Sequence, residues 1–598
     1  MRNNGAFLAV LLGLFATAVG TAWAQETTTV VDDDLSQQTQ AAARAKRAEQ
    51  ATDSEWKILV AGEVTYGVGV RTSEQKSNLK PGGGNNSDDG DLNYPKGSAF
   101  ANVVQGDIGI DVRNRGGYGI RLGAMAWYDY NLIHHWVPHG NNPNSYVPGP
   151  LSDSGFARQA RFAGVDLLDT YVYGKIEPGL GTVDWRVGKV TLQRDPGFTF
   201  VGGLRDLDAR NTAASTRPGA QPSEAVIPFW GAAARWAVTP LLRVEGFWQF
   251  APQKSVPAGC GTFFASNDYT PQGCNRVFYN KAITEQQNVA LGIFIPRADD
   301  ITPKDRPEQV GLGVSYLVKP LGTRAGVLFA HYDSRVGYVS VLKGTGLGPN
   351  GGNSYLIDYP ANKNMLSFTT ATRIPGLKIG WLNEVSITDG QPLQQNPSLL
   401  LAAFLRGEGA YAPDAIAQPP RSVYQGWDRF RVIQVQTGMR KDFGAGLGAL
   451  ASYLAFEVGL KHVDGLPDRA ARPYGRPEID DACSTDAECD TLDGFVTSNA
   501  WAYRIHGGMV FGFTGTDILL RPNFTFGQDV KGWAYDYAFV EGRKNIRLAL
   551  DADFTRYLFA NVTFAATPGG LFNSRKDRAW VLASVGVRFF PRDSGKGK

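Results

Sequence analysis

Apolar and polar residues alternate through this chain in segments that are too long for the strands of an ordinary soluble protein. In the first segment, the apolar register holds Trp56, Ile58, Val60, Gly62, Val64, Tyr66, Val68 and Val70, and the polar register holds Lys57, Glu63, Thr65 and Arg71. Such alternation places the two sets of side chains on opposite faces of one strand. An ordinary strand has about 5–6 residues, whereas a strand that crosses a bilayer needs about 9–11. The segment 56–70 therefore predicts a membrane-crossing strand.

The pattern recurs along the chain, and the gaps between successive segments are alternately long and short. The short gaps are turns rich in Gly and Pro, such as 178–181 and 320–322, and the long gaps are polar loops in which we expect no clear strand. We predict strands at 56–70, 101–113, 118–130, 163–177, 182–190, 226–238, 241–251, 309–318, 323–333, 363–373, 376–388, 428–441, 446–460, 500–513, 516–527, 543–555, 557–567 and 579–589.

Long loops on one side only are typical of an outer-membrane barrel, with short periplasmic turns and long extracellular loops. A soluble sandwich has no reason to place its long loops at every second connection. The predicted fold is therefore all-β, a transmembrane antiparallel β-barrel of about 18 strands with both termini in the periplasm. The segments 182–190 and 309–318 are the weakest, so 16 strands is the alternative.

The composition agrees with a β-rich protein and excludes one class of partner. The 598 residues include 71 glycines and 11% aromatic residues, a mixture that suits strands and turns. The formal net charge of +3 gives no basis for binding nucleic acid.

The N-terminus predicts export. Arg2 precedes an apolar stretch at 6–19, and Ala22-Trp23-Ala24 is a small-x-small cleavage pattern. The stretch is shorter than the roughly 20 apolar residues that a membrane helix needs. We predict a signal peptide at 1–24 cleaved after Ala24, a polar periplasmic lead-in at 25–55, the barrel at 56–590, a polar tail at 591–598, and a place in the bacterial outer membrane.

Four cysteines fall into two local pairs. Cys260 and Cys274 share one long loop, and Cys483 and Cys489 share another. Four cysteines allow three pairings, and proximity in sequence favours Cys260–Cys274 and Cys483–Cys489. Because an exported chain meets an oxidising environment, we expect disulfides there. A zinc site would need CxxC pairs, which the sequence lacks.

The segment Asn85–Gly97, NNSDDGDLNYPKG, is the most acidic stretch of the first long loop. An EF-hand needs a Glu at its twelfth position, but that position is Lys96 when Gly90 is taken as the invariant glycine. Asx-turns in a solvated loop at the cell surface account for the composition without a metal.

His134, His135 and His139 lie together in the second long loop. Three imidazoles so close in sequence are a weak candidate for a zinc or copper site, because their spacing is irregular and no thiol is near. We therefore predict no metal and no cofactor.

The polar registers of the strands supply the candidate lumen. They carry both signs of charge, which argues against selection of solutes by charge alone. Neutralising Arg243 and Glu245 should alter transport more than replacing the three histidines. The predicted lumen-facing residues are Glu63, Asp107, Asp111, Arg113, Arg121, Asp129, Arg243, Glu245, Glu384, Gln434, Gln436 and Glu457.

Motifs of the common hydrolases and nucleotide-binding enzymes are missing. The sequence contains no Gly-x-Ser-x-Gly elbow, no phosphate-binding loop ending in Gly-Lys-Ser/Thr, and no His-Glu-x-x-His. We therefore predict that the protein is not an enzyme, and an outer-membrane lipid hydrolase is the least favoured alternative.

Several segments, taken in order, resemble a large family of proteobacterial outer-membrane β-barrel proteins that is catalogued as a domain of unknown function and is porin-like. They are DDGDLNYPKG, RLGAMAWYDY, LLDTYVYG, WRVGK, RPGAQPSEAVIP, GCGTFFASNDYTPQGC, HYDSR, NEVSITDGQPLQQN, FVEGR and KDRAW. The sequence departs from the family after WRVGK, where it has VTLQRDPGFTF (Val190–Phe200). The final strand, which ends in aromatic residues, resembles the signal read by the barrel-assembly machinery, although the tail 591–598 follows it.

The resemblance implies traffic of hydrophobic molecules, because members of the family often occur beside a periplasmic lipid-carrier-like lipoprotein and an inner-membrane exporter. The leading hypothesis is therefore a conduit for hydrophobic or lipid-like molecules that works with those partners and contacts outer-membrane lipids. The alternatives are a general or solute-specific porin and a surface receptor or adhesin.

Overall fold

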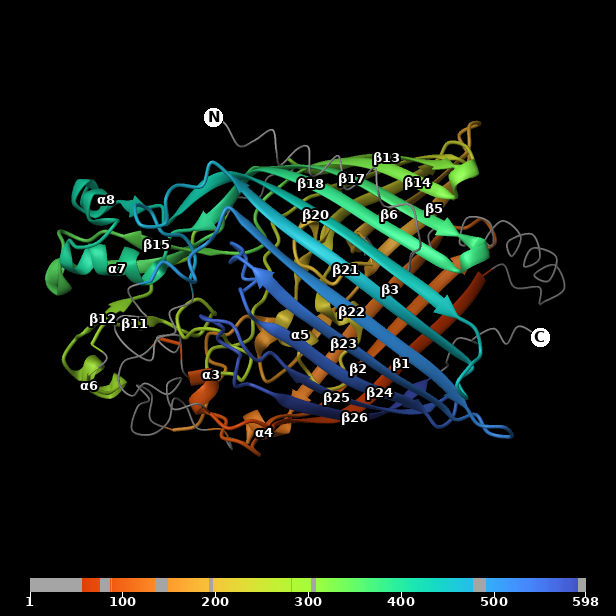
Figure 1. Cartoon of the computed structure of the whole chain (residues 1–598), viewed down its shortest axis with the longest axis horizontal. Coiled ribbons are helices and arrows are strands. Elements are labelled where there is room, and N and C mark those ends of the chain that lie inside the picture. The colour runs from red at the N-terminus through yellow and green to blue at the C-terminus, as the bar shows by residue number, and fades with distance from the viewer. Residues whose placement is uncertain are drawn as a thin grey trace.

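A computed structural model describes residues 56–75, 86–87, 89–134, 137, 149–192, 197–280, 282–302, 308–476 and 491–589. The chain forms one closed antiparallel barrel of 18 strands, counting β4 and β5 as one interrupted strand (Figure 1). The strands are β1 Trp56–Arg71, β2 Ala99–Asn114, β3 Gly119–Asp129, β4 Ala163–Leu167, β5 Thr170–Ile176, β6 Thr182–Val190, β9 Phe229–Ala237, β10 Leu242–Gln249, β13 Gln309–Val318, β14 Thr323–Tyr332, β17 Lys363–Ile374, β18 Ile379–Gln394, β20 Trp427–Phe443, β21 Ala451–Asp464, β22 Asn499–Gly512, β23 Leu519–Lys531, β24 Lys544–Asp553, β25 Leu558–Ala566 and β26 Trp580–Phe589.

The first and last strands close the barrel. Tyr66 of β1 pairs with Val104 of β2 on one side and with Val585 of β26 on the other. The strand count and both of the weakest predicted strands are confirmed, so the alternative of 16 strands is wrong. Along the chain, successive strands are joined alternately by short turns and long loops. The short turns therefore lie at one end of the barrel, the short-turn end, and the long loops at the other, the long-loop end.

Two details of the strand prediction are wrong. The predicted strand 163–177 is broken at Leu168 and Asp169, where Asp169 turns its carboxylate to the backbone N–H of Thr191. Residues 226–227 are not part of β9 but form the short strand β8 (Val226–Ile227), which pairs with β7 (Ala209–Arg210). Both departures occur where the long connection between β6 and β9 enters the barrel.

The barrel presents opposite surfaces to its two environments. Along β1, Val64 and Tyr66 are exposed on the outside, whereas Thr65 between them is buried on the inside. The same alternation gives the other strands an apolar outer belt, as a bilayer requires. Exposed members of this belt include Ile108, Ile120, Leu122, Leu312, Val327, Phe329, Leu366, Phe368, Leu548 and Val562.

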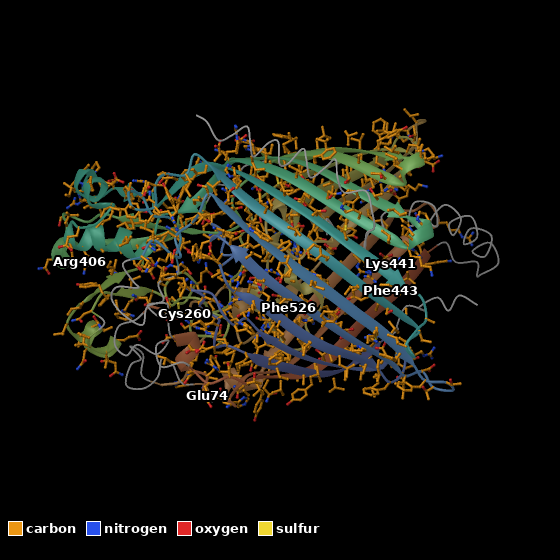
Figure 2. All side chains as sticks on the ribbon, in the orientation of Figure 1. Glu74, Cys260, Arg406, Lys441, Phe443 and Phe526 are labelled. Atoms are coloured by element: carbon orange, nitrogen blue, oxygen red, sulfur yellow. A yellow bond between two sulfur atoms is a disulfide. The ribbon has the colours of Figure 1, made fainter. Side chains whose placement is uncertain are left out.

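The long loops, where we predicted no clear strand, contain regular structure of their own. They form a cap at the long-loop end, which carries Cys260 and Arg406, whereas Lys441 and Phe443 mark the short-turn end (Figure 2). The elements of the cap are β11 Arg276–Phe278, α6 Glu285–Ala290, β12 Phe294–Pro296, β15 Tyr338–Leu342, β16 Ser354–Asp358, α7 Pro397–Arg406, α8 Ala412–Ala417 and β19 Val423–Tyr424.

The cap has an apolar core that short-range sequence patterns did not reveal. Val339 and Val341 of β15 and Tyr355 of β16 pack against Leu400 and Phe404 of α7. Asn396 caps α7 by accepting a hydrogen bond from the N–H of Leu399, and Gly407 ends the helix in a left-handed conformation. The predicted disulfide Cys260–Cys274 is present in the same group of loops.

The acidic segment of the first long loop is buried, which corrects the prediction of a solvated loop. Asp89 and Asp91 lie in the short helix α3 (Asp89–Leu92), and their exposed fractions are 0% and 2%. Asp91 pairs with Arg71 at 2.6 Å, and the Asn93 amide donates to Gly261 O at 2.8 Å. The segment therefore joins the first loop to the wall and to the loop that carries the disulfide.

This burial predicts a pH-dependent loop. Burial raises the pKa of the Asp89 carboxyl to about 7, above the value of about 3.9 in an unfolded chain. The folded loop then holds a proton that the unfolded loop releases, so docking is most stable below about pH 4 and weakens as the pH rises to about 7. The protection factors of residues 89–100, which correct the exchange rates for the intrinsic rate at each pH, should be higher at about pH 5 than at about pH 8. Asp89→Asn should remove most of this difference, and an unchanged pH dependence in that variant would contradict the assignment to Asp89.

Some predictions fall outside the described residues. These are the signal peptide 1–24, the lead-in 25–55, the tail 591–598, the disulfide Cys483–Cys489, and His135 and His139 of the histidine cluster. Among the helices of the described residues, none has the length and apolarity to cross a membrane.

Candidate functional site

The described residues of the connection between β6 and β9, 191–192 and 197–228, run through the inside of the barrel, and we call them the internal loop. Figure 1 shows its helix α5 (Thr212–Ser215) enclosed by the strands. The loop leaves the wall after Val190, contacts β18, β20 and β21, then contacts β1 and β3, and rejoins the wall at Phe229. It therefore crosses the lumen, and any solute that passes through the barrel must pass beside it.

Two wall carboxylates hold the first half of the internal loop. Glu457 of β21 accepts hydrogen bonds from the backbone N–H and the hydroxyl of Thr199, at 3.0 and 2.8 Å. Glu384 of β18 accepts one from the backbone N–H of Leu204 at 2.8 Å. Between them, Gln434 of β20 donates to Val201 O at 3.1 Å. Hydrogen bonds to a charged acceptor are stronger than neutral ones, so these contacts fix the loop to this wall.

Glycines allow the backbone to lie directly against these side chains. Gly202 and Gly203 have φ values of 99° and 60°, a region that residues with a Cβ rarely adopt. A Cβ added at Gly202 would lie 2.1 Å from the Gln434 Oε1 atom, and one at Gly203 would lie 2.0 Å from Glu384 Oε1. The close approach therefore requires glycine at both positions.

The second half of the internal loop lies against the opposite side of the lumen. The Gln221 amide donates to Glu63 of β1, and the Arg217 guanidinium lies 4.0 Å from the centre of the Trp127 ring of β3. Gln221 and Glu224 form a capping box at the start of the 3-10 turn Pro222–Ala225. Burial raises the pKa of the Glu224 carboxyl to about 7, so its charge changes near neutral pH.

A second loop, residues 532–543 between β23 and β24, also reaches into the lumen. Its Asp536 forms an ion pair with Lys461 of β21, and its Phe539 packs edge to face on Phe200 of the internal loop at 5.3 Å. On the β17 side, Lys363 lies 3.9 Å from Asp206 of the internal loop. The two loops thus contact each other as well as the wall.

The predicted lumen-facing residues divide into three groups. Glu63, Glu384, Gln434 and Glu457 contact the internal loop, as described above, and Gln436 pairs with Glu384 across β18 and β20. The second group contacts other parts of the wall: Asp111 accepts from the Tyr173 hydroxyl at 2.9 Å, and Asp129 caps the helix α4 (Tyr130–Ile133). The remaining residues have wall partners in the strand register and are Asp107, Arg113, Arg121, Arg243 and Glu245.

Sequence reasoning missed three buried cations of the wall and the two loop carboxylates that pair with two of them. Lys363, Lys461 and Arg504 are buried, and Lys461 is in the same register as Glu457. The shared register with Glu457 was the sequence signal that could have identified Lys461 as inward-facing. Asp206 and Asp536 carry no such signal, because they lie in loops whose path depends on contacts with distant strands.

The described side chains of the site offer hydrogen-bonding and ion-pairing groups to a solute. No group of three His, Cys, Asp or Glu residues within the described ranges could hold a metal ion. His134, the described member of the histidine cluster, stacks on the Tyr130 ring at 3.8 Å. The geometry is that of a lumen narrowed by a loop that hydrogen bonds and ion pairs hold in place.

Comparisons with known proteins give a family and several structural likenesses. A family model described as "Protein of unknown function (DUF1302)" matches residues 5–589. No curated protein matches the sequence. Similar solved structures are OccAB3 of Acinetobacter baumannii (11% identity, 89% of this chain and 99% of that chain, TM-score 0.38), the outer membrane protein opdK of Pseudomonas aeruginosa (9%, 89% and 98%, 0.38) and a BenF-like porin of Pseudomonas fluorescens Pf-5 (8%, 89% and 98%, 0.40).

Proposed function

Because this chain belongs to DUF1302, a family of proteins of unknown function, we propose its activity from its own geometry: it is a porin-like outer-membrane channel for polar solutes, narrowed by the internal loop. The main observation in support of this proposal is that an apolar outer belt surrounds a polar lumen. The lumen is lined by Glu63, Glu384, Gln434 and Glu457. A polar interior inside an apolar belt suits the passage of water-soluble molecules across a bilayer.

The placement in the outer membrane has two supports. The apolar belt needs a bilayer, and the predicted signal peptide directs export. In this topology the long-loop end, with the cap, faces outward and the short-turn end faces the periplasm. The role that we propose is passive conduction, so it needs no catalytic residue and no cofactor.

A conduit for hydrophobic molecules is the second candidate, and one observation favours it. The inner wall near the long-loop end is apolar where Phe100, Val103, Met125 and Trp127 pack with Phe263 of a long loop. A cavity of about 70 Å³ lies beside this cluster. In this alternative, a periplasmic lipoprotein and an inner-membrane exporter would supply or receive the molecule.

Planar-bilayer recording separates the two candidates. Purified full-length protein should give discrete, ion-conducting events whose size increases when the internal loop is released. A folded, heat-modifiable barrel that shows no conductance but transfers a fluorescent fatty acid between vesicles would refute the polar channel and support the hydrophobic conduit. Hydrolysis of a chromogenic ester by the same preparation would support the alternative that the protein is a lipid hydrolase.

A further inference from the structure

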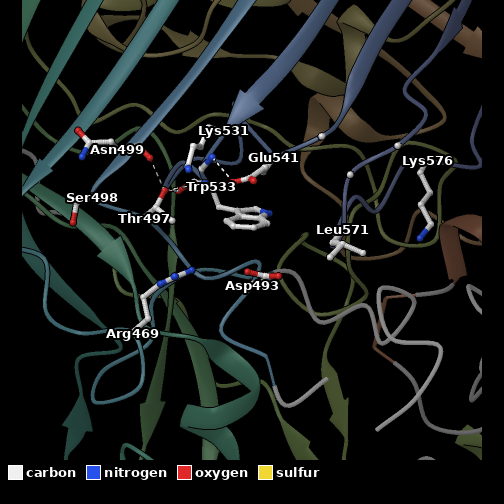
Figure 3. A pocket seen from close by; sticks show the side chains of 14 residues that line it. Arg469, Asp493, Thr497, Ser498, Asn499, Lys531, Trp533, Glu541, Leu571 and Lys576 are labelled. Carbon is white, nitrogen blue, oxygen red and sulfur yellow. Dashed lines mark hydrogen bonds between the residues drawn. The ribbon is translucent and has the colours of Figure 1, made fainter. Parts of the chain in front are cut away.

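A pocket of about 890 Å³ lies at the long-loop end and is lined in part by residues of the second lumen loop, 532–543. Residues of three loops and of the adjoining strand ends surround it, and Figure 3 shows Trp533 at its centre with Arg469, Asp493 and Glu541 around it. Its size lies within the range of about 300–1,000 Å³ that is usual for small-molecule sites. None of the sequence motifs considered above pointed to it.

The floor of the pocket contains a hydrogen-bond donor that lacks an acceptor. Trp533 is 8% exposed, and its indole Nε1 has no hydrogen-bond partner in the described part of the chain. Figure 3 shows this nitrogen directed toward the space between Glu541 and Leu571. Buried donors are normally satisfied, so an acceptor atom of a ligand is the group that this position lacks.

The backbone holds this floor rigidly. The N–H of Trp533 donates to the hydroxyl oxygen of Thr497 at 3.0 Å, and the N–H of Thr497 donates to Trp533 O at 3.0 Å. Gly532 has φ of 82°, and a Cβ there would lie 2.2 Å from Asn499 O. The indole therefore belongs to a preformed site, which is favourable for binding because little ordering is left to the ligand.

The walls provide cationic and anionic groups together. Arg469 donates a hydrogen bond from one guanidinium nitrogen to Leu492 O at 2.9 Å. Lys531, at the end of β23, lines the same pocket. Glu541 accepts the N–H of Gly532 through one carboxylate oxygen at 2.8 Å, and Asp493 also lines the pocket. A ligand that uses all of these groups carries an anion for the cations and hydroxyl groups for the carboxylates and the indole N–H.

We propose that this pocket binds a small polyhydroxylated carboxylate, of the class of the sugar acids. Its carboxylate contacts Arg469 and Lys531, and its hydroxyl groups donate to Asp493 and Glu541. A hydroxyl or ring oxygen accepts from Trp533. The inference rests on the proposed channel function and adds a class of solute to it. Binding of that solute to the pocket can be measured separately from conduction.

The position of the pocket relates solute binding to passage through the lumen. Trp533 and Glu541 lie in the same loop as Asp536 and Phe539, which contact Lys461 and the internal loop. A solute captured on one side of this loop is thus held next to the groups that line the lumen.

Calorimetric titration of the full-length protein in detergent tests the proposal, with galacturonate as the probe. Galactose lacks the carboxylate and hexanoate lacks the hydroxyl groups, so both should bind much more weakly. Lys531→Gln should weaken galacturonate binding by about ten- to a hundredfold, the range for a hydrogen bond to a charged group. Trp533→Phe keeps an aromatic ring but loses the N–H, and it should weaken binding by about two- to tenfold. Lys441→Gln, which removes the same charge at the short-turn end, should have no effect.

Three outcomes would overturn the proposal: no heat with galacturonate from a heat-modifiable barrel, equal affinity for galactose, or equal loss in the Lys441→Gln and Lys531→Gln variants. Bilayer recording of the same preparation keeps the two proposals apart. Conductance without galacturonate binding refutes only the pocket, whereas binding without conductance refutes only the channel.

Discussion

Replacing Glu384 and Glu457 together by Ala should raise the single-channel conductance several-fold, because the internal loop loses the acceptors that hold it against β18 and β21. Glu457 accepts two hydrogen bonds from Thr199, and Glu384 accepts one from Leu204. Hydrogen bonds to charged groups contribute about 1.5–3 kcal/mol each, so the double variant removes enough free energy to populate a displaced loop. Planar-bilayer recording measures the change.

The matched control is Asp551→Ala. Asp551 is also a carboxylate of the wall, but it accepts from Asn523 and Asn561 of the neighbouring strands β23 and β25. This variant should leave the conductance close to that of the unmodified protein. Glu457→Gln keeps an acceptor oxygen and should give an intermediate value. If Asp551→Ala and the double variant opened the channel equally, the increase would come from loosening of the wall, and the tethering role would be wrong.

The barrel could be predicted from the sequence because the bilayer imposes its own pattern on every strand. Val64 and Tyr66 face the outside and Thr65 the inside, and a register error of one residue would reverse all of them. The strand break at Leu168 and Asp169 has no such signal, since it arises where Asp169 meets Thr191 of a chain segment that leaves the wall.

The path of the loops could not be predicted, because no shared environment such as the bilayer imposes a pattern on their sequences. The composition of Asn85–Gly97 is typical of a solvated turn, yet Asp91 is buried against Arg71 at the end of β1 and Arg578 of the last long loop. In the lumen, the strand register identified Glu384 and Glu457 as inward-facing candidates. It gave no information on Thr199 and Leu204, which approach them from the divergent segment Val190–Phe200 and the residues after it.

The buried ion cluster at the end of β1 predicts the largest loss of stability. Arg71 is completely buried and pairs with Asp91 at 2.6 Å and with Asp577 at 3.1 Å. It also donates to the backbone oxygens of Asp91, Tyr94 and Asp577, so one side chain joins the first and the last long loops. Arg71→Met keeps an unbranched apolar stem but leaves two carboxylates buried without this cation, which costs about 3–5 kcal/mol.

Loss of Arg71 should therefore undock these loops while the barrel stays closed. Limited proteolysis should cut the first and the last long loops of the Arg71→Met variant, and heat-modifiable mobility should persist because the wall strands keep their pairing. Lys96→Met is the control within the same loop: Lys96 pairs with Glu74 at 2.9 Å, but both side chains are exposed. Exposed pairs contribute only about 0–1 kcal/mol, so this variant should resist cleavage like the unmodified protein. Equal resistance of both variants would show that the loops dock through their apolar contacts, such as Tyr94 with Phe263, and that the ion cluster adds little.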